Sequence, residues 1–191
     1  MTMIARAIIL VVFTSLMVSC RKAPETSQVT EKRRLTMWDH SGDPLIAPMP
    51  PEWRQVPSTQ LRIYNYRFGE GSQGGEVYIS RASGGVLPNA NRWLKQFGAQ
   101  EVPSVGAFPK VKMLGLDAVV VAASGKFGGA MGRAEQDNAG VLGVIADTGN
   151  GLITVKMIGN GDAVSAERER MLKFCENLRI REIKSASSKA E

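Results

Sequence analysis

Two segments of this chain are apolar on both faces of an extended strand, and they restrict the fold more than any other feature. Residues 116–123 read Leu-Asp-Ala-Val-Val-Val-Ala-Ala, and residues 141–146 read Val-Leu-Gly-Val-Ile-Ala. A strand without a polar face has to be covered on both sides. The sequence therefore predicts a β-sheet whose centre lies between two layers of other structure.

The turns between the predicted strands favour a largely antiparallel sheet. Residues 61–68 alternate in polarity and are followed by several glycines and a second strand at 76–80, which together indicate a hairpin. Asn150-Gly151 separates the strands predicted at 140–146 and 152–158, and this dipeptide is a strong hairpin signal. Residues 110–114 read as one more strand. Hairpins join antiparallel neighbours, so most of the sheet is expected to be antiparallel.

Two helices are predicted to supply the covering layers. Asn89 is expected to cap a helix that runs to Phe97 and ends at Gly98, and Asp162 to cap a longer one that ends near Leu178. These elements predict an α+β fold: a largely antiparallel β-sheet covered by helices, as an α/β/α sandwich. A single domain over residues 44–183 accounts for all of them, and Trp53 is expected to hold the preceding proline-rich arm on the core.

The first twenty residues have the organisation of an export signal. Arg6 precedes an apolar run at 7–18, which is shorter than the ~20 residues that a spanning helix needs. Ser19-Cys20 follows directly and resembles the lipobox of bacterial lipoproteins. The resemblance implies a signal peptide at 1–19 and a lipid on Cys20 that attaches the chain to a membrane of the cell envelope. A plain secretory signal and an uncleaved anchor are the alternatives.

The distribution of charge argues against a nucleic-acid-binding protein. The formal net charge is +6, but residues 20–34 contribute +3 of it and residues 35–181 only +2. A folded domain that binds nucleic acid is normally itself basic. The basic excess instead lies in residues 20–34, within the segment 20–43 that is predicted to be a flexible tether beside the lipid. Such a basic segment is either attracted to anionic headgroups or simply a solvated linker. Residues 184–191 are predicted to be a disordered tail.

The order of elements permits one resemblance to be named. The proline-rich arm, two strands, a helix, further antiparallel strands and a C-terminal helix are similar to the order in PsbP-like domains. The segments 91–93 and 153–159, with Gln96 nearby, also look like those of planctomycete-type lipoproteins. PsbP-like proteins are mostly non-catalytic accessory subunits and binding modules. The resemblance therefore implies an α/β/α fold and a binding role, and it carries over no functional residue.

Patterns for catalysis, metal binding or cofactor binding are not recognisable in the sequence. His40 is the only histidine, and neither a Gly-x-Ser-x-Gly elbow nor a phosphate-binding loop is present. Cys175 shares a helical face with apolar residues, so we expect a buried, unreactive thiol. No metal and no cofactor are predicted.

The segment from Gly125 to Ala139 is the first candidate for a functional surface, because it reads as a long glycine-rich loop. Its charged residues Lys126, Arg133 and Asp137 are candidate binding residues, and Arg92 and Gln96 on the first helix form a weaker second candidate. We expect a non-catalytic binding or scaffolding module with an envelope protein as partner. The alternatives are a hydrolase with a site near residues 125–139 and a carrier of small ligands.

Overall fold

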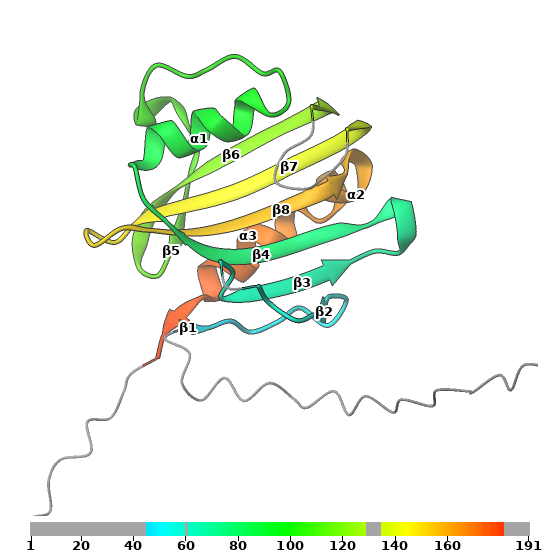
Figure 1. Cartoon of the computed structure of the whole chain (residues 1–191). Coiled ribbons are helices and arrows are strands. Elements are labelled where there is room, and N and C mark those ends of the chain that lie inside the picture. Colours follow the sequence, from blue (N-terminus) through cyan, green and yellow to red (C-terminus); the bar gives the residue numbers. More distant parts are fainter. Residues whose placement is uncertain (1–44, 60, 129–134, 182–191) are drawn as a thin grey trace, which may run out of the picture. The chain divides into compact units, whose positions relative to one another are not determined.

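The computed structural model describes residues 45–59, 61–128 and 135–181 (Figure 1). Its centre is a seven-stranded sheet in which every pair of neighbours is antiparallel. In spatial order its strands are β2 (Arg54–Gln55), β3 (Tyr64–Phe68), β4 (Gly75–Ala82), β8 (Leu152–Asn160), β7 (Gln136–Asp147), β6 (Leu116–Phe127) and β5 (Lys110–Met113). Three helices pack against the sheet, so the predicted α+β class is confirmed.

The helices lie on opposite faces of the sheet. Helix α1 (Val86–Lys95) follows β4, packs against β6 and β7, and carries the chain over to β5 at the sheet edge. Helices α2 (Gly161–Ala166) and α3 (Arg168–Asn177) follow β8 and cover the other face (Figure 1). Two short 3-10 turns, at Gly71–Gln73 and Val105–Ala107, lie in the connections before β4 and β5.

The alternation of side chains along β6 and β7 produces a separate apolar core on each face. Val119 and Val121 pack with Trp93 and Leu94 beneath α1. On the other face the core also draws on the edge strands and α3: it includes Tyr66, Ile79, Val120, Leu142, Val144, Val155, Met157, Met171, Phe174 and Leu178. The central part of each strand is therefore covered on both sides, as its composition predicts.

Trp53 holds the arm on the core, as predicted. Its side chain is 2% exposed, and its ring lies 5.1 Å from that of Phe174 and 6.0 Å from that of Tyr66, measured between centroids. The indole Nε1 donates a 2.8 Å hydrogen bond to Oε2 of Glu167. The arm and the C-terminal end of the domain also meet in a two-stranded sheet of β1 (Leu45–Ile46) and β9 (Arg179–Ile180).

Both predicted helix caps are wrong. Helix α1 begins after Gly85, one turn before Asn89, whose amide instead donates to the carbonyls of Ser83 and Gly85. Asn160 caps α2, because its Oδ1 accepts hydrogen bonds from the backbone N–H groups of Asp162 and Ala163. The expected long C-terminal helix is divided at Glu167 into α2 and α3.

The predicted long loop at 125–139 is also wrong in extent. Strand β6 continues to Phe127 and β7 begins at Gln136, so residues 125–127 and 136–139 of that segment belong to the sheet. The Asn150-Gly151 hairpin is confirmed by the pairing of Asp147 with Leu152. The predicted signal peptide at 1–19, the tether at 20–43 with Cys20 and His40, and the tail at 184–191 lie outside the described residues.

Candidate functional site

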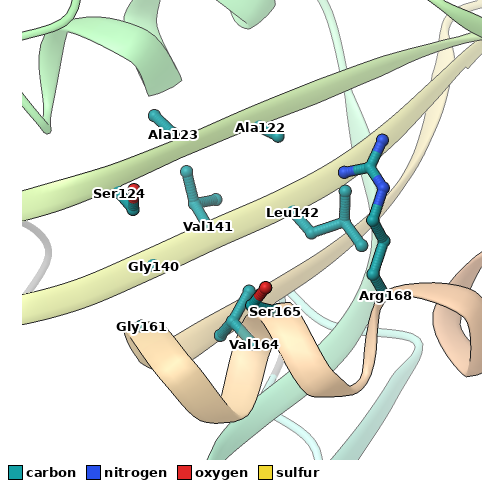
Figure 2. A pocket seen from close by; sticks show the side chains of 10 residues that line it. All are labelled: Ala122, Ala123, Ser124, Gly140, Val141, Leu142, Gly161, Val164, Ser165 and Arg168. Atoms are coloured by element: carbon teal, nitrogen blue, oxygen red, sulfur yellow. The ribbon is translucent and has the colours of Figure 1, made fainter.

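An open groove lies between α2 and residues 122–124 of β6 (Figure 2). Its volume is about 220 Å³. The residues that line it are Ala122, Ala123, Ser124, Gly140, Val141, Leu142, Gly161, Val164, Ser165 and Arg168. The strands contribute small or apolar groups, whereas the helical side contributes a hydroxyl and a guanidinium group.

Glycine at two positions permits α2 to lie close to β7 along one wall of the groove. A Cβ at Gly140 would stand 3.1 Å from Cα of Gly161 and 3.1 Å from Cβ of Val164. The amide of Asn138 on β7 also donates a 3.1 Å hydrogen bond to Oδ2 of Asp162, at the start of α2. The helix therefore has a fixed position over β7 but leaves the neighbouring part of β6 uncovered.

Arg168 supplies the positive charge of the groove from the first position of α3. The side chain is exposed and extends past Leu142 toward β6 (Figure 2). The preceding residue, Glu167, is fixed by Trp53 and by an ion pair with Arg170, whose pKa this hydrogen bond raises. The break between the two helices therefore places Arg168 beside the groove. In the part of the chain that the structure describes, the guanidinium group of Arg168 has no hydrogen bond or ion pair.

The chemistry of this groove suits binding rather than proton transfer. It offers one guanidinium group and the hydroxyl groups of Ser124 and Ser165, which are donors to an anionic or carbonyl group. A nucleophilic serine needs a general base within hydrogen-bond reach. The lining residues include no histidine and no carboxylate that would serve as one.

A second polar region lies on the α1 side of the sheet, around the buried ammonium group of Lys156. Lys156 is 5% exposed; its Nζ donates a 2.9 Å hydrogen bond to Oε1 of Gln96 and stands 5.0 Å from the centroid of the Trp93 ring. A buried ammonium group needs such partners because its desolvation is costly. This cluster ties α1 to β8 and has a structural role.

A related cluster around Glu76 lies at strands β3 and β4, toward the β2 side of the sheet. Arg62 forms a 3.0 Å ion pair with Glu76, and its guanidinium carbon lies 4.0 Å above the ring of Tyr78. Arg62 also donates to Oδ1 of Asn65. Glu76 and Asn65 are buried, so this network stabilises the pairing of β3 with β4 and leaves little surface for a ligand.

The predicted site residues are not brought together by the structure. Lys126 forms an exposed 3.3 Å ion pair with Glu135, and Asp137 is exposed on β7. Arg133 lies outside the described residues. Arg92 on α1 is exposed and donates a hydrogen bond to Asn89, whereas Gln96, directly after α1, is half-buried against Lys156 and not on an exposed surface as expected.

Two residues with specific positions were missed by sequence reasoning. Lys156 stands on the more polar side of its strand, and Arg168 stands among the alternating charges of residues 167–170, which have the pattern of an ordinary solvated helix face. The asparagine cap at Asn160 is the one signal that could have placed the start of the C-terminal helix correctly.

Among residues 45–59, 61–128 and 135–181, no group of three or more histidine, cysteine or acidic side chains is arranged to hold a metal ion. Within the same ranges, every helix is too short or too polar to span a bilayer. The described part of the chain also has no buried side-chain nitrogen or oxygen without a hydrogen-bond partner. The groove beside β6 therefore remains the leading candidate site.

Comparisons with known proteins include a distant structural likeness. No protein-family model matches the chain, and no curated protein matches it. The fold is similar to the crystal structure of LpqN, which is involved in cell envelope biogenesis of Mycobacterium tuberculosis. The match has a TM-score of 0.44 and 13% sequence identity, and covers 72% of this chain and 83% of that one. The resemblance to PsbP-like domains stays a prediction.

Proposed function

We propose that this chain is a lipid-anchored protein of the cell envelope whose α+β domain binds another envelope component without catalysing a reaction. The anchor is proposed from the sequence, where an apolar run of signal-peptide length ends at Ser19-Cys20. A lipid-anchored domain meets its partners at a membrane surface, and its basic tether is attracted to anionic headgroups.

The groove beside β6 is the observation that carries the binding role. It combines a small apolar floor with the unpaired guanidinium group of Arg168, and this pairing of shape and charge suits the side chains of a partner. Its volume of about 220 Å³ is below the ~300–1,000 Å³ usual for small-molecule sites, which favours a macromolecular partner over a carried ligand.

The hydrolase alternative gains no support from the described residues near 125–139. Lys126, Glu135 and Asp137 are all exposed there, whereas catalytic acids and bases usually lie in a cleft among groups that perturb them. An enzymatic role would need a different site from the one that the sequence suggested.

Native mass spectrometry of the protein extracted from its own membranes tests both parts of this proposal. We expect the mass of residues 20–191 plus acyl chains, together with a bound component. Cys20→Ala should lose the acyl mass, whereas Cys175→Ala, which changes the other cysteine, should keep it. An unacylated wild-type chain would refute the anchor, and a lipidated chain that never carries a partner would refute the binding role.

A further inference from the structure

The outer edge of β6 is open beyond Val120. Strand β5 pairs with β6 only as far as Lys110 and Val119, and the N–H of Val120 then donates a 2.8 Å hydrogen bond to the carbonyl of Pro109. Strand β6 itself continues to Phe127. Residues 121–127 therefore pair with β7 on one side and with no described strand on the other.

The direction of the Val120 bond shows which backbone groups face outward. In an antiparallel ladder, successive residues direct their N–H and C=O groups to opposite sides. Because Val120 bonds toward β5, Ala122 and Ser124 direct theirs to the same open side, and Ala123 directs its own toward β7. Both Ala122 and Ser124 are exposed. Such a row of donors and acceptors is a template for an added strand.

The open edge is short. The register between β6 and β7 shifts between Gly125 and Phe127, and Lys126 lies at this bulge with its side chain exposed. A bulge and a lysine are features that restrict unlimited pairing between sheet edges. The usable part of the edge, residues 121–125, suits one short extended segment.

The groove lies beside this edge and would receive side chains of such a segment. Ala122 and Ser124 are small and line the groove together with Leu142 and Val164 (Figure 2). Alternate side chains of an added strand project to one face of the sheet. Every second side chain would therefore pass over Ala122 and Ser124 toward Arg168, where a carboxylate would gain a charge-assisted hydrogen bond.

We propose that an extended segment of a partner protein, with an acidic side chain on the groove side, adds to β6 as a further strand of the sheet. The inference rests on the proposed binding function and names its partner class. A second copy of this chain is disfavoured by charge. Antiparallel pairing of two β6 edges about Ala123 would bring both copies of Arg168 and Lys126 to one face of the joined sheet.

A proline at position 124 tests the backbone pairing directly. Ser124→Pro removes the outward N–H but leaves the bonds to β7, because proline is tolerated on an edge strand where its nitrogen faces solvent. Ser124→Ala is the matched control, since it removes the hydroxyl and keeps the N–H. The probe is a capped synthetic heptapeptide, obtained by selecting a random heptapeptide library on the full chain in detergent.

We expect the selected peptides to alternate apolar residues and to contain an acidic residue. Their Kd should rise about tenfold or more for Ser124→Pro and about fivefold for Arg168→Ala, whereas Ser124→Ala, which loses only the hydroxyl donor, should raise it by less than either. The amides of Ala122 and Ser124 should exchange hydrogen more slowly when the peptide is added to the wild-type chain. This second measurement decides the matter even if the proline variant does not fold.

Three results would overturn the inference. The first is failure to select any peptide, or selection of peptides that bind the proline variant equally well. The second is a concentration-dependent dimer that Ser124→Pro abolishes, which would assign the edge to a second copy. The third is a membrane-extracted Ser124→Pro chain that keeps its bound component, which would leave the proposed function intact and place its surface elsewhere.

Discussion

The indole ring of Trp93 lies directly on the backbone of Gly143, so helix α1 packs closely against the middle of the sheet. A Cβ built on Gly143 would overlap the six-membered part of that ring. Trp93 is 4% exposed and packs with Val121 and Ile145. The distance between helix and sheet on this face is therefore set by the absence of a side chain at residue 143.

Gly143→Ala should destabilise the domain by about 1–3 kcal/mol, because a buried and tightly packed indole has little room to move. Urea unfolding followed by tryptophan fluorescence measures this loss. Gly106→Ala is the matched control, since only the hydroxyl of Ser104 lies within 4 Å of its Cβ position, and it should change stability little. Equal stability of the two variants would show that α1 shifts freely over the sheet.

The hydrogen bond from Trp53 to Glu167 should stabilise the domain more than an exposed contact does, because it links the arm to the junction of α2 and α3. Trp53→Phe keeps most of the ring and removes the Nε1 donor, so we expect a loss of about 1–3 kcal/mol. Glu167→Gln keeps an acceptor and should cost less. A double-mutant cycle with Glu167→Ala isolates the coupling; a coupling near zero would refute this role.

Substitutions of Gln96, at the end of α1, and of Arg92, within it, should differ in their effect on stability. Gln96→Ala deprives the buried ammonium of Lys156 of an acceptor and should cost about 1–3 kcal/mol. Arg92→Ala changes an exposed residue and should cost about 0.5 kcal/mol or less. Thermal unfolding of the two variants measures both. The reverse order would mean that Arg92 is the structural residue of the pair.

Replacement of both partners of this buried pair should reduce the stability of the domain less than removal of one partner does. In Lys156→Met combined with Gln96→Leu, no charge is left buried without its acceptor, and the apolar volume is retained. We expect this double variant to be more stable than Gln96→Ala alone. A double variant that is less stable would show that the Lys156 cluster contributes net stability and not only a fixed register between α1 and β8.

The layered architecture could be predicted because it follows from side-chain alternation. Val119, Val120 and Val121 need cover on both faces wherever the strand lies, so two covering layers follow without knowledge of the partners. The helix starts could not be read in the same way. Asn89 and Asp162 are good caps by residue type, but α1 is capped by Gly85, four residues earlier, and α2 by Asn160, two residues earlier and the last residue of β8.

The candidate site was less predictable because it depends on contacts between distant segments. Lys156 is buried only because α1, sixty residues earlier in the chain, brings Gln96 and Trp93 over β8. The edge of β6 is open beyond Val120 because β5 begins only after Pro109. The proline is the only feature of the sequence that marks this boundary. The residue types at 125–139 suggested a loop over the whole segment, whereas the pairing of β6 with β7 extends both strands into it and shortens the loop.

Cys175 should be unreactive in the folded chain and should make stability fall at alkaline pH. The thiol is fully buried, and burial raises its pKa above the usual value of 9.0, because the thiolate is poorly solvated there.

In the unfolded chain the same thiol ionises as pH passes that value. The unfolded state then binds fewer protons than the folded one, so the free energy of unfolding decreases as pH rises further. Below the unfolded pKa this contribution is fully present. We expect Cys175→Ala, though less stable overall, to show a smaller decrease between pH 8 and pH 10 (about one unit on either side of that pKa). Alkylation by iodoacetamide at pH 8 should follow the rate of unfolding, and rapid labelling without denaturant would contradict the burial of this side chain.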